Sequence, residues 1–125
     1  MKKMLVVEDD FLSQKVLLKL FQQEFEIDVC ESSDEFYQKI KNTNYDIIIM
    51  DISIKGEKSG IDLTIELKSS PKTSRIPILC LTAHAFLKDR KTAIDSGVDM
   101  YLAKPVPNDI LRNAVKFLVN KNSST

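Results

Sequence analysis

The amino-acid sequence predicts an α/β fold, a doubly wound parallel sheet of five strands that alternate with five helices. Short apolar runs typical of strands alternate along the chain with segments whose apolar residues recur at helical spacing. The most apolar run, residues 47–50, carries no polar side chain, as expected for a central strand covered on both faces. Asp51 follows that run directly, which places it at the carboxyl edge of the sheet, where open α/β sheets form their binding sites.

Composition and charge describe a globular chain of one domain. Its 125 residues are 43% hydrophobic and 29% charged, and 18 basic residues balance 18 acidic ones. This balance argues against direct nucleic-acid binding, and no apolar run is long enough for membrane insertion. The first residues lead into the acid Glu8, unlike a signal peptide. We expect a cytoplasmic, stand-alone domain over residues 1–125, with an ordered core at about 3–119 and a frayed polar tail at 120–125.

The two cysteines, Cys30 and Cys80, each lie inside a strand-like run. Neither a CxxC spacing nor a neighbouring histidine points to a metal site or a disulfide. We expect both residues to be buried, reduced thiols.

The first half of the chain contains three predicted strands and two predicted helices. The strands cover residues 4–7, 27–31 and 45–50. Asp10 is the expected N-cap of the first helix, and a capping box of Ser32 and Glu35 starts the second helix. The apolar stripe of the first helix comprises Leu12, Val16, Leu17, Leu20 and Phe21, with Gln14, Lys15, Lys19 and Gln22 opposite. The buried residues of the second helix are Phe36 and Ile40.

The second half repeats the alternation, with strands predicted at residues 76–81 and 100–103. Glycines and charges predict a loop at residues 54–60. Helices are predicted at residues 61–68, at 85–96 with Gly97 as its left-handed C-terminal residue, and from Pro107 onward. The expected buried residues of the first and last of these helices are Ile61, Leu63, Ile65, Leu67, Ile110, Leu111, Ala114, Val115 and Leu118.

Charged and hydroxyl side chains stand where the predicted strands end. Glu8 and Asp9 follow the first strand and Asp51 follows the third. If these strands are neighbours, the three carboxylates converge and their repulsion requires a cation. Oxygen ligands of this kind suit Mg²⁺, or Mn²⁺, which completes its shell with water and phosphate oxygens. A carboxylate beside such a cation can attack phosphorus, with Lys104 and Thr82 stabilising the charge that develops.

Five short segments stand in order along the chain, each next to a predicted strand. They are LVVEDD (5–10), DIIIMD (46–51), LTAHA (81–85), GVD (97–99) and YLAKP (101–105). Together they resemble the receiver domain of two-component response regulators, over essentially the whole chain. The resemblance implies a flavodoxin-like three-layer sandwich with strand order 2-1-3-4-5. It also implies a phosphorylation-controlled signalling module, not an enzyme with its own substrate. Its partners would be a histidine kinase or a histidine phosphotransfer protein, and a downstream protein target.

The resemblance also implies roles for individual residues. Asp51 would accept the phosphoryl group. Asp9, Asp51 and the backbone carbonyl of Ser53 would bind Mg²⁺ directly. Glu8 would act on the metal mainly through water, and Lys104 would pair first with Asp51 and then with the phosphoryl oxygens.

A second set of implied roles concerns switching and tuning. Thr82 would turn toward the phosphoryl group and Tyr101 would turn inward behind it, which reshapes the face of the fourth helix, fifth strand and fifth helix. From the residues alone, Tyr101 fits a passive strand position equally well. The Lys104–Pro105 peptide bond would be cis. The residues that would tune the lifetime of the acyl phosphate are Ser53, Ala83 and His84.

The loop after Asp51 departs from the family pattern. Ile54 and Lys55 stand where the family usually has Met-Pro, and Gly60 comes one residue later than usual. We expect a longer, more mobile loop that leaves the metal ligands intact but alters partner contacts.

Three other hypotheses compete with a stand-alone receiver. The chain could be a receiver domain excised from a hybrid histidine kinase. An Asp-nucleophile phosphatase of the haloacid dehalogenase type needs a second Asp two residues after its nucleophile, and the Glu8–Asp10 segment lacks that spacing. A flavodoxin-like flavin carrier needs a Ser/Thr-rich phosphate loop at the same position, where three acids would repel phosphate.

Overall fold

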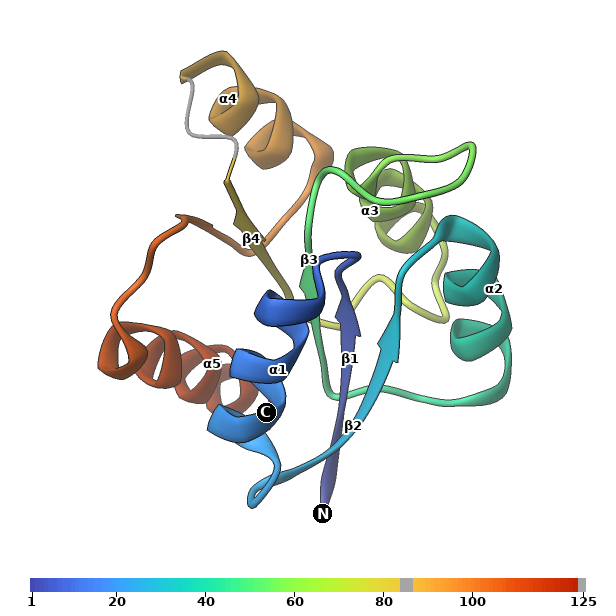
Figure 1. Cartoon of the computed structure of the whole chain (residues 1–125). Helices are drawn as coiled ribbons and strands as arrows, with labels where there is room; N and C mark the ends of the chain where they lie inside the picture. Colours follow the sequence, from blue (N-terminus) through green and yellow to red (C-terminus); the bar gives the residue numbers. More distant parts are fainter. Residues whose placement is uncertain (84–86, 124–125) are drawn as a thin grey trace.

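The computed structural model contains one parallel sheet with the strand order β2-β1-β3-β4-β5, which confirms the predicted fold (Figure 1). The structure describes residues 1–83 and 87–123. The strands are β1 (Lys2–Val7), β2 (Phe25–Cys30), β3 (Ile47–Met50), β4 (Ile78–Thr82) and β5 (Met100–Ala103). The helices are α1 (Phe11–Phe21), α2 (Ser33–Asn42), α3 (Gly60–Ser69), α4 (Leu87–Ser96) and α5 (Asn108–Ser123). Each parallel pairing is thus made through a helical crossover.

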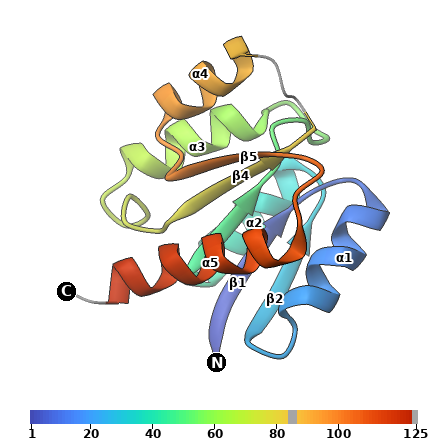
Figure 2. The ribbon, with the colours of Figure 1, turned by 90° about the vertical axis from the view of Figure 1, so that its left-hand side faces the viewer.

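Helices cover both faces of the sheet. α1 and α5 lie on one face, and α2 and α3 lie on the other, with α4 beside α3 (Figures 1 and 2). The side chains of β3 alternate between the two cores that result. Ile47 and Ile49 pack with α1 and α5, whereas Ile48 and Met50 pack with α2 and α3. The strand is therefore buried on both faces, as its sequence predicts.

β1 lies between β2 and β3, and the carboxyl ends of these three strands are level. Val7 pairs in register with Cys30 of β2 and with Met50 of β3. The ladder continues one step further, because the amide of Glu8 donates to the Cys30 carbonyl and the amide of Asp51 donates to the Val7 carbonyl, each at 2.9 Å. Glu8 and Asp51 therefore leave adjacent strands at the same height.

The predicted N-caps of the first two helices are present. The carboxylate of Asp10 accepts a hydrogen bond from the Ser13 amide at 2.9 Å and caps α1. Ser32 caps α2 by accepting from the Glu35 amide at 3.2 Å. In the predicted capping box the Glu35 carboxylate would also accept from the amide of Ser32. It accepts instead from the amide of the preceding residue, Glu31, at 3.0 Å.

The buried stripe of α1 is rotated relative to the prediction. Leu12 and Val16 are 71% and 53% exposed, whereas Gln14 is only 9% exposed. Gln14 shares a helical face with Leu17 and Phe21 at the spacing i, i+3, i+7. The apolar residues on the neighbouring face are therefore left toward solvent.

Two further details of the helices differ from the predictions. Ile65 of α3 and Ile110 of α5 are each 48% exposed, because the other apolar residues of their helices already occupy the core face. Pro107 precedes α5, and its carbonyl accepts from the Leu111 amide at 3.1 Å. α5 includes residues 120–123 of the segment predicted as a polar tail.

Candidate functional site

Three carboxylates meet at the carboxyl edge of the sheet. Oxygen atoms of Glu8, Asp9 and Asp51 all lie within 4.8 Å of one another. Glu8 is 2% exposed and Asp51 is 8% exposed, whereas Asp9 is half-buried. The three acids line a cleft of about 250 Å³ together with Ser53 and Lys104. The convergence expected from the sequence follows from the adjacency of β1 and β3.

Lys104 enters this cleft from the end of β5. Its ammonium group donates to a carboxylate oxygen of Glu8 and, at 3.1 Å, to the hydroxyl oxygen of Ser13. The same nitrogen lies 3.9 Å from Asp51 Oδ2. The expected pairing with Asp51 is therefore secondary to the contact with Glu8. The Lys104–Pro105 peptide bond is cis, as the resemblance implied.

The cluster carries more negative than positive charge. Burial raises the pKa of Glu8, the hydrogen bond from Lys104 lowers it, and the neighbouring Asp51 raises it. One ammonium group faces three carboxyl groups, which leaves negative charge for a further cation to neutralise. Carboxylate oxygens at one open cleft are the donors that a hard divalent cation prefers. The residues present therefore fit the expected metal ion.

Other residues expected at the site lie around the cleft at different depths. Thr82 is fully buried at the end of β4, and its carbonyl accepts from the Lys104 amide at 2.8 Å. Ala83 is exposed and lines the cleft. Ser53 is also exposed, and its amide donates to Asp51 Oδ1 at 3.3 Å. The main chain at Lys104 is thus held by a backbone hydrogen bond to β4, and that at Ser53 by a hydrogen bond to the Asp51 carboxylate.

Tyr101, the predicted switch residue, occupies the centre of the β4–β5 pairing. It pairs in register with Cys80, and its side chain is partly buried. Burial raises the pKa of its phenol, and Cys80 and Asp89 raise it further. Tyr101 thus belongs to the region where β5 meets α4. His84, the other residue expected near this region, lies outside the described residues.

The loop after β3 is anchored to the junction between β2 and α2. Lys55 forms a parallel bridge with Ser32, in which its amide donates to the Glu31 carbonyl at 3.1 Å and its carbonyl accepts from the Ser33 amide at 3.0 Å. Gly56 has a φ of +102°, and a Cβ there would fall 2.4 Å from the Ser33 hydroxyl, so glycine is required. These contacts argue against the loosely held loop that we expected.

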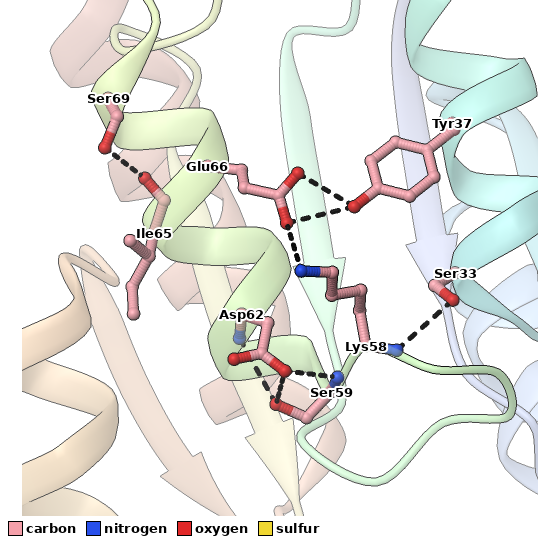
Figure 3. Close-up of polar contacts among 8 residues, drawn as sticks. All are labelled: Ser33, Tyr37, Lys58, Ser59, Asp62, Ile65, Glu66 and Ser69. Carbon is pink, nitrogen blue, oxygen red and sulfur yellow. Dashed lines mark hydrogen bonds and ion pairs between the residues drawn. The ribbon is translucent and has the colours of Figure 1, made fainter.

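The far end of the same loop is anchored to α3 and α2 (Figure 3). Ser59 and Asp62 form a complete capping box, in which the Ser59 amide donates to Asp62 at 2.9 Å and the Asp62 amide donates to Ser59 at 3.2 Å. The ammonium nitrogen of Lys58 lies 4.0 Å from Glu66 Oε2. The other carboxylate oxygen of Glu66, Oε1, accepts a hydrogen bond from the phenol of Tyr37 at 2.8 Å. The loop is therefore tied at both ends to the helices beside the site.

Sequence reasoning missed two polar residues of α1 that reach the site. Ser13 accepts from Lys104, and the side-chain amide of Gln14 donates to the backbone carbonyl of Glu8 at 2.6 Å. The spacing of Gln14 with Leu17 could have revealed its buried position. Ser13 carries no comparable indication, because a short polar residue is common in the first turn of a helix.

Comparison with known proteins identifies the family to which this chain belongs. The family model described as the response regulator receiver domain matches residues 4–116. The chain belongs to the response regulator receiver domain family. It is therefore a receiver domain of two-component systems, which favours the signalling hypothesis over the phosphatase and the flavin carrier.

Similar proteins include receiver domains from two kinds of longer protein. The chain is 31% identical over 138 residues to hybrid signal transduction histidine kinase I of Dictyostelium discoideum, a match that covers 99% of this chain and 8% of the kinase. It is 32% identical over 120 residues to the phosphate regulon transcriptional regulatory protein PhoB of Rhizobium meliloti, covering 95% of this chain and 52% of the regulator. The receiver domain thus spans only part of the length of these relatives.

Solved receiver domains share the fold closely. The receiver domain of a signal transduction histidine kinase from Syntrophus aciditrophicus has a TM-score of 0.91 and 25% identity, covering 100% of this chain and 95% of that one. The receiver domain of the sensor histidine kinase PA1611 from Pseudomonas aeruginosa, with a magnesium ion in its active-site cleft, has a TM-score of 0.86 and 25% identity, covering 95% and 98%. Within residues 1–83 and 87–123, none of the helices has the length and apolar character needed to cross a bilayer.

Proposed function

We propose that Asp51 is the phosphoryl acceptor of this receiver domain. Its donor is a phosphohistidine on a histidine kinase or a histidine phosphotransfer protein, in the cytoplasm. The observation that carries this proposal is the convergence of Glu8, Asp9 and Asp51 at one edge of the sheet, with Lys104 across from them. Acid convergence of this kind is costly unless a cation neutralises the repulsion, and such a cation also stabilises the charge of a transferring phosphoryl group.

The contacts of Glu8 and Asp51 favour Asp51 over Glu8 as the nucleophile. Glu8 is engaged by Lys104 and by the amide of Asp10 at 3.1 Å. Asp51 Oδ2 lies 3.9 Å from the Lys104 ammonium, beyond hydrogen-bond distance, and Asp51 lines the cleft. Its oxygen therefore keeps a lone pair available for attack, while Lys104 is near enough to turn toward the product.

The proposed transfer is a displacement at phosphorus. A carboxylate oxygen of Asp51 attacks the phosphorus atom, the P–N bond of the phosphohistidine breaks, and the imidazole nitrogen keeps the electron pair and takes up a proton. The product is an acyl phosphate on Asp51. Lys104 and the hydroxyl of Thr82 donate to the phosphoryl oxygens, on which negative charge accumulates.

The acids and one backbone carbonyl would hold the metal. Asp9, Asp51 and the carbonyl of Ser53 would bind Mg²⁺, or Mn²⁺, directly, and Glu8 would act through water. When bound, the ion neutralises charge on the oxygens of the transferring group. The magnesium ion in the cleft of the PA1611 receiver domain supports this assignment.

Phosphorylation would then change the face formed by α4, β5 and α5, where a downstream protein binds. Thr82 and Tyr101 stand on neighbouring paired strands, with Thr82 at the end that faces the site. A phosphoryl dianion attracts the Thr82 hydroxyl, and the space that Thr82 leaves can receive the Tyr101 ring. Ser53, Ala83 and His84 would set how quickly water reaches the acyl phosphate.

An apolar cavity beside the cleft is a suitable docking site for a helix of the protein that carries the phosphohistidine. The cavity has a volume of about 480 Å³ and is lined in part by Leu12, Val16 and Leu111. It shares Ser13 and Lys104 with the acidic cleft, so a helix seated there would bring its histidine within reach of Asp51. Both Leu12 and Val16 are more than half exposed, as a docking surface requires.

Phosphorylation assays test this proposal with two donors. The protein incubated with Mg²⁺ and acetyl phosphate should gain one phosphoryl group by intact mass, and Asp51→Asn should gain none. Val16→Glu should be phosphorylated normally by acetyl phosphate but at least about tenfold more slowly by a phosphohistidine protein. Phosphorylation of Asp51→Asn at the wild-type rate would refute the acceptor, and unchanged transfer to Val16→Glu would refute the docking surface.

A further inference from the structure

Gln14 is a buried polar residue of α1 whose side chain reaches two neighbouring strand ends. Its Nε2 donates to the backbone carbonyl of Glu8 at 2.6 Å and to Glu31 Oε2 at 3.2 Å. The residue is 9% exposed, and its bond to the Glu8 carbonyl is buried, whereas the bond to Glu31 is partly buried. A buried side-chain amide is costly to leave without hydrogen-bond partners, so the Gln14 side chain is held in the conformation that makes these contacts.

The carbonyl that Gln14 binds is the one at which β1 leaves the sheet. The last residue of β1 is Val7, and the amide of Glu8 still bonds to the Cys30 carbonyl of β2. The carbonyl of Glu8 belongs to the next peptide unit, which joins it to Asp9. The Gln14 amide thus fixes the orientation of the peptide that presents both acids to the cleft.

The second contact of Gln14 leads toward the segment that follows Asp51. Glu31 Oε1 lies 3.6 Å from Lys55 Nζ, and the backbone of Lys55 is paired with Glu31 and Ser33. Lys55 follows Ser53 by two residues. A chain of contacts from Gln14 through Glu31 to Lys55 therefore joins the two loops that carry the proposed metal ligands.

We propose that Gln14 is a positioning residue for the metal site. It holds the Glu8–Asp9 peptide and, through Glu31 and Lys55, sets the distance between that peptide and the loop after Asp51. The inference rests on the proposed function, since it concerns the same cleft. Groups that orient metal ligands typically change metal affinity by about 10- to 100-fold when removed.

A matched pair of variants separates the hydrogen bonds of Gln14 from its volume. Gln14→Met keeps the length of the side chain and adds no charge near the acids, but it has no hydrogen-bond donor. Gln22→Met, at an exposed residue just after the same helix, is the control. Mg²⁺ affinity is measured on the unphosphorylated proteins by following amide chemical shifts during a titration. Urea unfolding in EDTA reports any loss of stability separately.

We expect Gln14→Met to bind Mg²⁺ about tenfold more weakly than the wild type, and Gln22→Met to stay within about threefold. Wild-type affinity in Gln14→Met would overturn the inference, even if that variant is less stable, and leave the proposed function standing. Failure of the wild type to bind Mg²⁺ would overturn both. If Gln14→Met does not fold, Gln14→Asn provides the same comparison with a side chain too short to span both acceptors.

The link to the second loop is tested by a double-mutant cycle. Lys55→Met alone should weaken Mg²⁺ binding by only about twofold, because the Lys55–Glu31 ion pair is largely exposed. If the two loops are coupled through Gln14, the effect of Lys55→Met should disappear in the Gln14→Met background. Additive effects would overturn the link to the loop after Asp51.

Discussion

The ammonium group of Lys104 is hydrogen-bonded to Glu8 and lies 3.9 Å from Asp51. The amine therefore serves first to compensate the most deeply buried acid of the cleft. A divalent cation would interact with the same carboxylates. Lys104 and the metal should thus compete, and the phosphoryl group would then give Lys104 a new partner.

This competition predicts that Lys104→Met binds Mg²⁺ more tightly. Removing the ammonium leaves Glu8 and Asp51 without their cation, so Mg²⁺ affinity should rise about three- to tenfold. The same loss should lower the free energy of unfolding in EDTA by about 1–3 kcal/mol. A magnesium titration and urea unfolding measure the two effects, with the exposed Lys88→Met as control. Weaker Mg²⁺ binding by Lys104→Met would contradict the competition.

Lys104 should also be needed to transmit phosphorylation. Lys104→Ala should keep the fold and accept a phosphoryl group, but phosphorylation should no longer strengthen binding of the downstream partner, because the phosphoryl oxygens lack their fixed cation. In the wild type, beryllium fluoride with Mg²⁺ should move amide chemical shifts within residues 82–112, and in Lys104→Ala these shifts should be largely lost. Full partner binding by the phosphorylated variant would disprove this role.

Magnesium should stabilise the folded domain by mass action. At a free concentration of 100 times the dissociation constant, the free energy of unfolding should increase by about 2.7 kcal/mol. Removal of the ion with EDTA should reverse the gain, and Asp9→Asn should reduce it strongly because a proposed ligand loses its charge. Urea unfolding with and without Mg²⁺ provides the measurement. An equal gain in Asp9→Asn would exclude Asp9 as a ligand.

Gly60 should tolerate substitution less well than Gly97. A Cβ on Gly60 would fall 1.9 Å from the backbone carbonyl oxygen of Asp51, so the β3–α3 connection itself must move. A Cβ on Gly97 would meet the flexible side chain of Lys68 at 2.9 Å, and its φ of +109° adds moderate strain. Gly60→Ala should cost about 3 kcal/mol or more of unfolding free energy, against about 1–2 kcal/mol for Gly97→Ala. Urea unfolding that reverses this order would contradict the structure.

The buried thiols predict a loss of stability in alkali. Burial raises the pKa of Cys30 and of Cys80, each to about 12, from an ordinary value of 9.0. Between these values the unfolded chain releases thiol protons that the folded chain retains, so the free energy of unfolding falls as the pH rises above 9. Urea unfolding at pH 8 and pH 10 should show a smaller decrease for the Cys30→Ala/Cys80→Ala variant. An equal decrease in both proteins would assign the effect to other groups.

The sheet and the acid cluster could be predicted because each rests on a local pattern. The apolar run before Asp51 identifies a buried strand, and the acids after Val7 identify the end of another. Parallel topology then requires that both ends share one edge. The cluster of Glu8, Asp9 and Asp51 follows from these two observations.

Contacts between side chains far apart in sequence could not be predicted in the same way. Whether Lys104 reaches Glu8 or Asp51 depends on ångström-scale distances within the cleft, which no sequence period encodes. The anchoring of Lys55 to Ser32 joins two loops across the end of β1, and glycines and charges in the sequence indicate only a loop. The polarity of Gln14 predicts a position facing solvent, and only its helical spacing with Leu17 and Phe21 indicates the buried face.

The anchored loop after β3 offers a place for a reporter of the signalling state. Glu57 is exposed between Lys55, which is paired with the β2–α2 junction, and Ser59, which caps α3. Because Cys30 and Cys80 are buried, a fluorophore directed to Glu57→Cys would label that position alone under native conditions. Such a dye would sit on a well-defined support a few residues from the proposed acceptor Asp51, so its emission would follow each cycle of phosphorylation in real time.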